Sequence, residues 1–285
     1  MNIKTTQSTS KSKAVSSALK PLLCHTFWEK DGLAIVNGDC LKIMDSIEKE
    51  SIDFIFCDPP FNVGKNYGGG AKADKKIDYR EWTQEWIDKA WQLLKPTGSI
   101  AVMNIIRNLP LLYSCFDSGI LINQVAWRNV SASHSKRGFW NSYQPITIYG
   151  KTEDYYFDTY AEKKIIAENL RWGGYSSEAK GQLLDYWDDI PFVYAGSIKH
   201  PEAILKKGSR KKEHPAQMPT KLIGRLIKFF TKQNDIILDP MMGIGTTLVA
   251  AHKLNRRAIG IELNEHYCKK TIERFNQTDL LTGAV

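Results

Sequence analysis

Short apolar runs alternate along most of the chain with stretches whose apolar residues recur at helical spacing. Runs of strand length lie at residues 33–36, 52–57, 99–103, 236–239 and 258–261. Helical spacing predicts helices at residues 41–47, 82–93, 222–230 and 248–254. Two further predicted strands, at residues 125–127 and 146–149, flank a polar segment. This alternation predicts an α/β fold with a mostly parallel sheet.

One predicted strand ends in the polar turn Asp58-Pro59-Pro60-Phe61. Because prolines lack a backbone N–H, this turn presents mainly acceptors, and Phe61 adds a flat apolar face. A planar heterocycle with an exocyclic amino group would suit such a site. Taken alone, Asp-Pro-Pro also fits an ordinary strand-ending turn, so the interpretation depends on a partner motif.

The partner motif is a glycine turn that follows the predicted strand at residues 236–239 and precedes a predicted helix. Glycines allow a ligand to approach the backbone, and a helix amino terminus attracts negative charge. Glu262 ends the next predicted strand, where a carboxylate can accept hydrogen bonds from both hydroxyls of a ribose. Strand, glycine turn, helix, strand and carboxylate together favour a nucleotide-binding crevice over a coincidental α/β unit.

The two halves form one sheet if the chain is circularly permuted. The strand at residues 236–239 is then strand one, and strands two to five lie at residues 258–261, 33–36, 52–57 and 99–103. In a doubly wound, Rossmann-like sheet of order 3-2-1-4-5, strands one and four are neighbours at the switch point. This order predicts that the glycine turn lies beside Asp58. Permutation costs little where chain ends lie close together.

Composition indicates the size of the domain and argues against several other classes of protein. A chain of 285 residues with 42% hydrophobic residues suits one large domain, or one domain with an insertion. Five scattered cysteines without a C-x-x-C spacing predict free thiols in a reducing compartment. The histidines and the apolar runs indicate neither a metal site nor a membrane span. Trp82 and Trp86 share the face of one predicted helix, so we assign both to the core or an interface.

The net charge of +8 is concentrated in a few segments. Residues 199–232 carry ten lysines and arginines against two glutamates, a balance that favours salt-dependent attachment to a nucleic acid backbone. Basic and aromatic residues interleave at residues 131–144, which suits phosphates and unstacked bases, although an ordinary polar connection fits equally. The candidate nucleic-acid-binding residues are Lys65, His134, Lys136, Arg137, Lys206, Lys207, Arg210, Lys211 and Lys212.

Together, five motifs resemble those of the permuted (β-group) S-adenosylmethionine-dependent amino-methyltransferases of DNA from restriction–modification systems. In chain order they are Gly38-Asp39-Cys40, Asp58-Pro59-Pro60-Phe61, His214-Pro215-Ala216-Gln217-Met218-Pro219, Asp239-Pro240-Met241-Met242-Gly243-Ile244-Gly245-Thr246-Thr247 and Gly260-Ile261-Glu262-Leu263-Asn264. The likeness covers roughly residues 33–275. Met218, Met241 and Ile244 depart from the family's usual lysine, phenylalanine and small serine, which affects the contacts expected at the methionine end of the cofactor.

The resemblance implies direct methyl transfer from S-adenosylmethionine to the amino group of a flipped base. Asp58 and a proline carbonyl would hold the N–H groups of the amine, and Phe61 would stack on the base. The implied catalytic residues are Asp58, Pro59, Pro60 and Phe61. The implied cofactor-binding residues are Asp39, Cys40, His214, Asp239, Pro240, Gly243, Gly245, Thr246, Thr247, Glu262, Leu263 and Asn264.

Adenine N6 is the expected target, because the family's adenine enzymes usually carry Asp where cytosine-N4 enzymes carry Ser. The alternatives are a cytosine-N4 enzyme, a methyltransferase of RNA or of a protein amide, and a catalytically silent DNA-binding subunit. The implied partners are double-stranded DNA, a second copy of the chain and a cognate restriction endonuclease, in the bacterial cytoplasm. The expected regions are a mobile basic tail (1–26), a catalytic half (27–150), a target-recognition insertion (151–212) and an S-adenosylmethionine-binding half (213–285).

Overall fold

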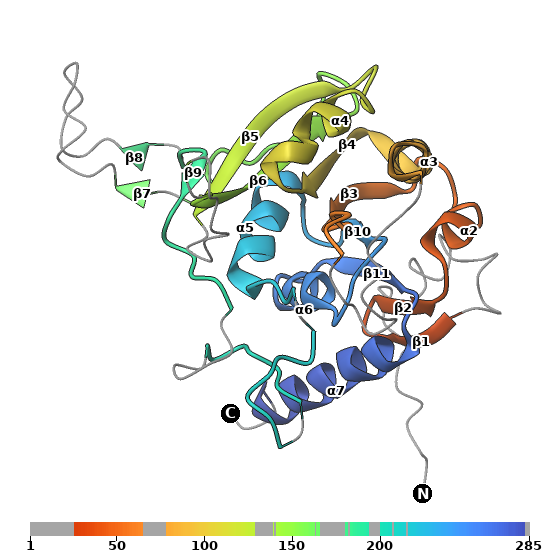
Figure 1. Cartoon of the computed structure of the whole chain (residues 1–285), viewed down its shortest axis with the longest axis vertical. Helices are drawn as coiled ribbons and strands as arrows, with labels where there is room; N and C mark the ends of the chain where they lie inside the picture. The colour runs from red at the N-terminus through yellow and green to blue at the C-terminus, as the bar shows by residue number, and fades with distance from the viewer. Residues whose placement is uncertain are drawn as a thin grey trace, which may run out of the picture.

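The computed structural model describes residues 26–64, 78–128, 139, 141–162, 164–165, 180–181, 183–193, 200–206, 208–214 and 216–282. Within these ranges, nine strands form one sheet in the order β1-β2-β11-β10-β3-β4-β6-β5-β9 (Figure 1). The strands are β1 (Thr26–Lys30), β2 (Leu33–Asn37), β3 (Ile52–Cys57), β4 (Leu94–Met103), β5 (Ile120–Arg128), β6 (Tyr143–Gly150), β9 (Tyr186–Trp187), β10 (Ile236–Asp239) and β11 (Arg257–Glu262). A separate pair joins β7 (Lys164–Ile165) and β8 (Lys180–Gly181).

Helices cover both faces of the sheet (Figure 1). One face carries α5 (Thr220–Phe230), α6 (Thr246–Lys253) and α7 (Glu265–Thr282). The other carries α2 (Cys40–Met44), α3 (Tyr79–Leu93) and, after the short 3₁₀ turn η2 (Ile106–Asn108), α4 (Leu109–Tyr113). Among the described residues, no helix is both long and apolar enough to cross a bilayer.

Alternation along the buried strands produces two hydrophobic layers. In β3, Phe54 and Phe56 point toward α5 and α6, whereas Ile55 and Cys57 point toward α2 and α3. Because both faces are covered, the central strands are apolar at almost every position, as expected for parallel strands. Trp86 is fully buried in the α3 layer, which confirms its assignment to the core.

The predicted central order is confirmed. β2, β11, β10, β3 and β4 are consecutive and parallel, which is the predicted order 3-2-1-4-5 of a permuted doubly wound sheet. The predicted strands near residues 125–127 and 146–149 are β5 and β6, which extend the sheet beyond β4 in antiparallel pairing. The structure adds β1, which pairs antiparallel with β2 and was not predicted.

Several predicted element boundaries were wrong, including those of α2 and β4. The helix expected to reach Ile47 ends at Met44, and Ile47 is buried beyond it in the turn. The strand expected at residues 99–103 begins at Leu94 and contains Pro96. Pro96 is tolerated because the pairing of β4 with β3 is interrupted there, between Leu94 and Ser99, so no ladder hydrogen bond is lost.

The pairing of β3 with β10 joins segments from opposite ends of the sequence. Ile237 lies opposite Phe54, and Leu238 lies opposite Ile55. At the amino edge of the pair, the Asp53 carboxylate accepts a hydrogen bond of 2.8 Å from the Ile236 amide, and its other oxygen pairs with Lys95 at 2.7 Å. This register brings the carboxyl ends of β3 and β10 to the same edge of the sheet.

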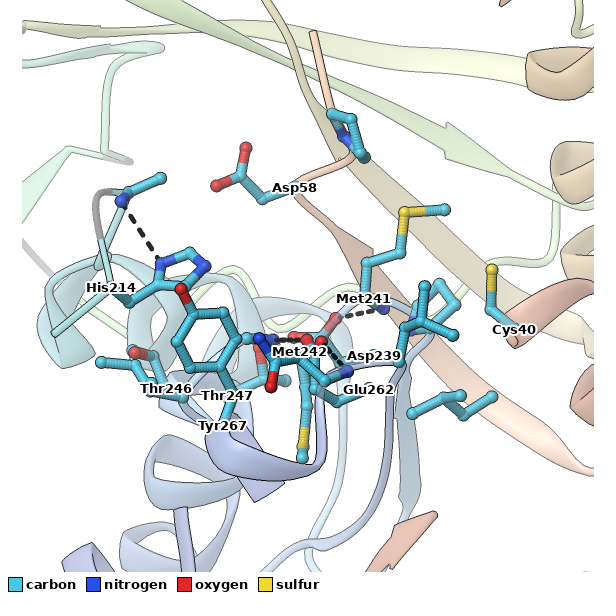
Figure 2. Close-up of a pocket in the computed structure, with 18 of the residues that line it drawn as sticks. Cys40, Asp58, His214, Asp239, Met241, Met242, Thr246, Thr247, Glu262 and Tyr267 are labelled. Atoms are coloured by element: carbon cyan, nitrogen blue, oxygen red, sulfur yellow. Dashed lines mark hydrogen bonds between the residues drawn. The ribbon is translucent and has the colours of Figure 1, made fainter. Parts of the chain in front are cut away.

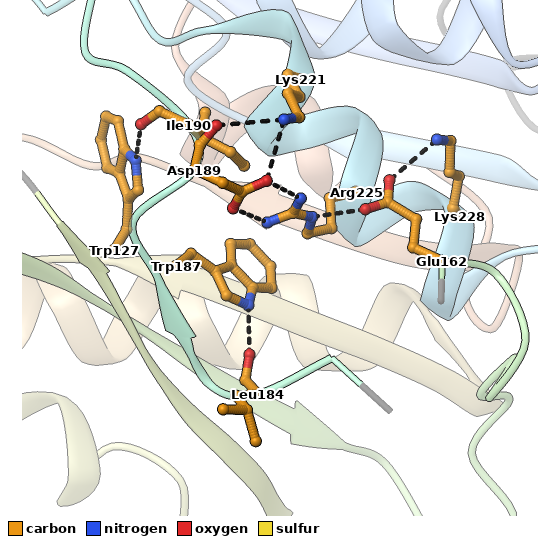
Figure 3. A network of polar contacts seen from close by, with 9 residues as sticks. All are labelled: Trp127, Glu162, Leu184, Trp187, Asp189, Ile190, Lys221, Arg225 and Lys228. Atoms are coloured by element: carbon orange, nitrogen blue, oxygen red, sulfur yellow. Dashed lines mark hydrogen bonds and ion pairs between the residues drawn. The ribbon is translucent and has the colours of Figure 1, made fainter. Parts of the chain in front are cut away.

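An ion-pair network connects α5 to the region expected to recognise the target (Figure 3). Arg225, whose side chain is 3% exposed, binds both oxygens of Asp189 at 2.9 and 2.7 Å and Glu162 at 2.8 Å. The guanidinium also lies 5.0 Å from the Trp187 ring centre. Hydrogen bonds from Arg225 hold the pKa of Asp189 well below its usual range. Glu162 and Asp189 both belong to the predicted insertion.

This network corrects part of the expected basic surface. Lys221 pairs with Asp189 at 3.0 Å, and Lys228 pairs with Glu162 at 3.0 Å. With Arg225 buried as well, three of the basic residues counted between 199 and 232 are neutralised within the fold. β9, which lies inside the expected insertion, forms the edge of the main sheet beside β5. The boundaries of the expected regions stay a prediction.

We expect Arg225→Met to lower the free energy of unfolding by about 2–4 kcal/mol at pH 7.5, because it removes the buried cation that two partly buried carboxylates share and leaves each with only its exposed lysine. The matched change Lys228→Met, in an exposed pair, should cost less than about 1 kcal/mol. The depressed pKa of Asp189 contributes stability above the unfolded pKa of about 4, which is lost as the pH falls through the folded pKa. The Arg225 penalty in urea unfolding should therefore stay nearly constant down to about pH 4 and shrink below it. Equal penalties for both variants would contradict this account.

Candidate active site

A cavity of about 510 Å³ opens at the carboxyl ends of β2, β11, β10 and β3. This volume is typical of a site for a small ligand. Figure 2 shows the Asp58 carboxylate on the His214 side of the cavity and Cys40 at its opposite end. Residues predicted from two distant parts of the sequence therefore line one cavity, as the switch-point argument required.

Asp239 fixes the turn that follows β10. Its carboxylate accepts a hydrogen bond of 3.1 Å from the Met241 amide and another from the Thr247 hydroxyl in the first turn of α6. The residue is only 4% exposed, and burial raises the pKa of Asp239 to about 7 although these hydrogen bonds oppose the shift. The carboxyl thus ties the strand end to the start of the helix.

The conformation and packing of this turn require glycine at two positions, where a side chain would clash. Gly245 has φ +72°, and a Cβ there would lie 2.2 Å from Cγ2 of Thr271 on α7. Gly243 has φ +55°, and its Cβ would lie 3.2 Å from Nε2 of His214. Arg274 of α7 donates a hydrogen bond of 2.6 Å to the Ile244 carbonyl. The turn is therefore packed closely between α7 and the segment that carries His214.

Glu262 lies across from the glycine turn at the end of β11. One carboxylate oxygen accepts from the Gly243 amide at 2.9 Å, and the other accepts from the Asn264 amide at 2.7 Å. Burial raises the pKa of Glu262 to about 7, although those hydrogen bonds oppose the shift. A carboxylate oxygen has a second lone pair, so each can accept a further hydrogen bond from a ligand in the cavity.

The opposite end of the cavity is formed where β2 meets α2. Asp39 caps α2 by accepting a hydrogen bond of 3.0 Å from the Leu41 amide. Asn37 donates to the Glu262 carbonyl at 2.8 Å, which holds the ends of β2 and β11 together. Cys40, Leu263 and Asn264 line the same end, and Leu263 is 73% exposed.

The segment from His214 to Pro219 connects the cavity to α5. Gln217 is buried; its amide donates to the Glu202 carbonyl, and its oxygen accepts from the Ile204 amide at 3.0 Å. The Glu202 carboxylate in turn accepts from the Thr220 amide at 2.8 Å at the start of α5. His214 packs edge-on against Tyr267 at 4.8 Å between ring centres. Met218, which departs from the family pattern, is a buried lining residue.

The cavity is acidic although the protein carries net positive charge. The described lining residues include Asp39, Asp58, Asp239 and Glu262 and no lysine or arginine. Asp58 and Pro60 contribute to the wall, and the Pro60 carbonyl accepts a hydrogen bond of 2.8 Å from the Tyr79 hydroxyl. Such a wall suits a ligand that carries positive charge or donates hydrogen bonds.

The family model for N6 and N4 DNA methylases matches residues 52–273, most of the chain. The chain belongs to this DNA methylase family. It is similar to the DNA adenine methyltransferase YhdJ of Escherichia coli K12, at 29% identity over 88% of this chain and 85% of that protein. It is 30% identical to the type II methyltransferase M2.LlaDCHI of Lactococcus lactis subsp. cremoris, over 90% of this chain and 94% of the relative.

A solved structure of the cytosine-N4-specific PvuII DNA methyltransferase shares the fold, with a TM-score of 0.64, 22% identity and 86% coverage of each chain. The protein is thus a DNA methyltransferase of the restriction–modification type, and its methyl donor is S-adenosylmethionine. The cavity fits this cofactor, because the acidic wall suits a sulfonium ion and both Glu262 oxygens keep a lone pair for a hydroxyl donor of the ligand.

The methyltransferase cavity contains most of the predicted cofactor-binding residues. Lining residues among them are Asp39, Cys40, His214, Asp239, Pro240, Gly243, Thr246, Thr247, Glu262, Leu263 and Asn264. Gly245 is absent from the lining and supports the turn from behind, against Thr271. Of the predicted catalytic residues, Asp58 and Pro60 line the cavity, whereas Pro59 does not and Phe61 is 8% exposed within the core.

Sequence reasoning missed several lining residues of the methyltransferase. Trp82, which we assigned to the core or an interface, lines the cavity one helical turn before the buried Trp86. Tyr267 lines it from the first turn of α7. Helical spacing identified the face that carries both tryptophans, but it could not show where along α3 the core ends and the cavity begins.

Four of the predicted DNA-binding residues are described. The described residues among Lys206–Lys212 belong to a tight hairpin: the Lys206 amide donates a hydrogen bond of 2.9 Å to the Lys211 carbonyl, and Gly208 has φ +69°. Lys206, Arg210 and Lys211 are exposed on it, whereas Lys212 lies over the Phe192 ring at 4.8 Å. The remaining candidates, Lys65, His134, Lys136, Arg137 and Lys207, lie outside the described residues.

We expect the affinity of this methyltransferase for S-adenosylmethionine to fall as the pH drops through about 7, because the raised pKa of Glu262 means that its carboxylate, the hydrogen-bond acceptor in the cavity, becomes protonated there. The dissociation constant should rise by up to about tenfold per pH unit below that value. Equilibrium dialysis between pH 8 and 5.5 measures it.

The matched variant is Glu262→Gln, which cannot titrate. It should bind the cofactor more weakly at pH 8 and show a flatter pH dependence, although Asp239, whose pKa is also about 7, keeps part of the slope. A wild-type dissociation constant that stays constant over this pH range would contradict the proposed role of the Glu262 carboxylate.

Proposed function

We propose that this DNA methyltransferase methylates the N6 amino group of adenine, flipped out of double-stranded DNA, with Asp58 as the catalytic acceptor. The observation that supports the proposal is that Asp58 lines the same cavity as Asp239 and Glu262. Asp at the first position of the catalytic motif favours adenine, and one similar protein is named an adenine methyltransferase. The likeness to a cytosine-N4-specific enzyme, at 22% identity, concerns the fold.

We assign the cofactor contacts from the positions of the lining residues. Glu262 would accept hydrogen bonds from the ribose hydroxyls, since each of its oxygens has a lone pair left beside a backbone donor. Asp39, Cys40, Leu263 and Asn264 would surround the adenine ring. His214, Asp239, Pro240, Thr246 and Thr247, with the turn of Gly243 and Gly245, would hold the methionine part. When bound, the cofactor supplies an electrophilic methyl group.

The role of Asp58 follows from the chemistry of the target. The lone pair of an exocyclic amino nitrogen is shared with the ring, which makes the nitrogen a weak nucleophile. A carboxylate that accepts one N–H, with a carbonyl of the Pro59-Pro60 turn accepting the other, favours a pyramidal nitrogen with a localised lone pair. These acceptors also stabilise the positive charge that develops on nitrogen. Flipping costs a few kcal/mol, which stacking on Trp82, a lining residue, would offset; Phe61, expected to stack on the base, is instead packed in the core.

We propose that the exposed cations of the Lys206–Lys212 hairpin contact DNA phosphates. The hairpin leads directly through Glu213 to His214 at the cavity, so a duplex bound there would bring its flipped base near Asp58. Lys65, His134, Lys136, Arg137 and Lys207 complete the proposed interface, and residues 151–212 would read the sequence. Since its substrate is cellular DNA, the enzyme would act in the bacterial cytoplasm. By its resemblance to the family, it would work as a homodimer and together with a cognate endonuclease.

Asp58→Ala should reduce methyl transfer at least about 100-fold, because an acceptor aimed at the developing charge is removed. Cofactor affinity should stay within about threefold of wild type. Mass spectrometry of nucleosides from unmethylated DNA measures both the rate and the base. N6-methyladenine formed by the wild type supports the proposal, whereas N4-methylcytosine selects the alternative target. Near-normal turnover by Asp58→Ala would exclude the catalytic role.

Replacing Lys206, Arg210 and Lys211 by Gln should weaken binding to every DNA sequence alike and reduce the salt slope, the change in log K with log salt, by up to about 2.7. The charge-matched control replaces Lys49, Lys232 and Lys253, which precede β3, β10 and β11 at the opposite edge of the sheet. Fluorescence anisotropy at several salt concentrations measures the slope. An equal loss in both triple variants would mean that only net charge matters.

A further inference from the structure

Two side chains from neighbouring elements hold the peptide carbonyls of the turn that carries Asp58. The Tyr79 hydroxyl, at the start of α3, donates a hydrogen bond of 2.8 Å to the Pro60 carbonyl. The Asn108 amide, in η2 after β4, donates one of 3.0 Å to the Phe61 carbonyl. Two consecutive carbonyls are thus held from two elements that both follow β3 in the sequence, one before β4 and one after it.

This external support matters because the turn has few donors of its own. Pro59 and Pro60 have no N–H, so neither can be fixed by donating a backbone hydrogen bond. The proline rings fix φ of both residues, but ψ can still vary, and with it the direction in which each carbonyl points. Side-chain donors are therefore the available means of fixing the Pro60 and Phe61 peptides.

Both donors are themselves held in place. The Tyr79 ring is 9% exposed and stacks on Trp82 at 5.9 Å between centres, with an angle of 27°. The Asn108 amide also donates to the Asn104 side-chain oxygen at 2.9 Å. Asn104 is 2% exposed and accepts a further hydrogen bond of 2.9 Å from the Ile105 amide. Neither donor has to be ordered at the moment of reaction.

We propose that Tyr79 and Asn108 are positioning residues for methyl transfer. They fix the Pro60–Phe61 and Phe61–Asn62 peptide planes. The turn that carries Asp58 and the Pro59 carbonyl is thereby anchored at its far end, which limits the directions from which these acceptors meet the target amine. Trp82 lines the cavity and stacks on Tyr79, so the ring that carries the Tyr79 hydroxyl packs against a wall residue of the cofactor cavity. The proposal rests on the proposed role of Asp58, since an acceptor that takes no part in transfer would not need to be aimed.

The test removes one donor at a time and keeps the packing. Tyr79→Phe deletes the hydroxyl and retains the ring on Trp82, and Asn108→Leu deletes the amide at similar volume. We expect single-turnover methyl transfer to slow about five- to tenfold in each variant, the effect of one hydrogen bond that orients a reacting group. The dissociation constant for S-adenosylmethionine, the KM for DNA and the melting temperature should stay near wild type. The double variant should lose less than the product of the single effects, because both residues hold one turn.

Tyr113→Phe is the matched control, because it also removes a tyrosine hydroxyl, one that donates at 2.7 Å to Gln124 away from the cavity. Its transfer rate should equal that of the wild type. An unchanged rate in Tyr79→Phe and Asn108→Leu would overturn the proposal. So would a rate that falls only in step with melting temperature and cofactor affinity, which is the pattern of a purely structural role.

The Asp58→Ala variant separates this proposal from the proposed function. If Asp58→Ala stays active, the catalytic assignment fails, and the positioning proposal falls with it whatever Tyr79→Phe does. If Asp58→Ala is inactive while both donor variants transfer at the wild-type rate, the positioning proposal alone is overturned. Slow transfer in the donor variants together with an inactive Asp58→Ala supports both.

Discussion

The register between β3 and β10 is the constraint on which the active site depends. Two residue pairs, Ile237 with Phe54 and Leu238 with Ile55, align strands that are separated by most of the chain. Because side chains alternate along a strand, a slip of one residue would exchange the two apolar layers and displace one strand end relative to the other. The Asp53 carboxylate, bonded to the Ile236 amide, links the same two strands at their amino edge.

Once the strands are in this register, a few carboxylate hydrogen bonds position the walls of the cavity. Asp239 joins the end of β10 to α6, Glu262 joins the end of β11 to the glycine turn, and Asp39 begins α2. Each carboxylate therefore has a structural hydrogen bond as well as a place in the cavity wall. The desolvation of Asp239 and Glu262, both with a pKa raised to about 7, is the energetic cost of building an acidic site inside a basic protein.

Much of this arrangement was readable from the sequence, for a physical reason. The central parallel strands are short apolar runs buried on both faces, and the polar residues that end them, such as Asp58 and Glu262, stand out against those runs. The supporting contacts were not readable. Tyr79 meets Pro60 and Asn108 meets Phe61 only through tertiary packing, and no spacing rule relates them. The count of lysines and arginines between residues 199 and 232 overestimated the free positive charge for the same reason. Sequence alone could not show that Arg225 is paired and buried.

The Arg225 network also limits how this fold can acquire a new sequence preference. If the proposed recognition region, residues 151–212, were exchanged between relatives, foreign residues would take the positions of Glu162 and Asp189 while α5 was unchanged. The buried guanidinium would then lose both partners, and the chimera would be destabilised before it met any DNA. Recombination that succeeds must therefore transfer matched residues on both sides of the junction. The proposed recognition region and the part that binds the methyl donor are therefore expected to diversify together.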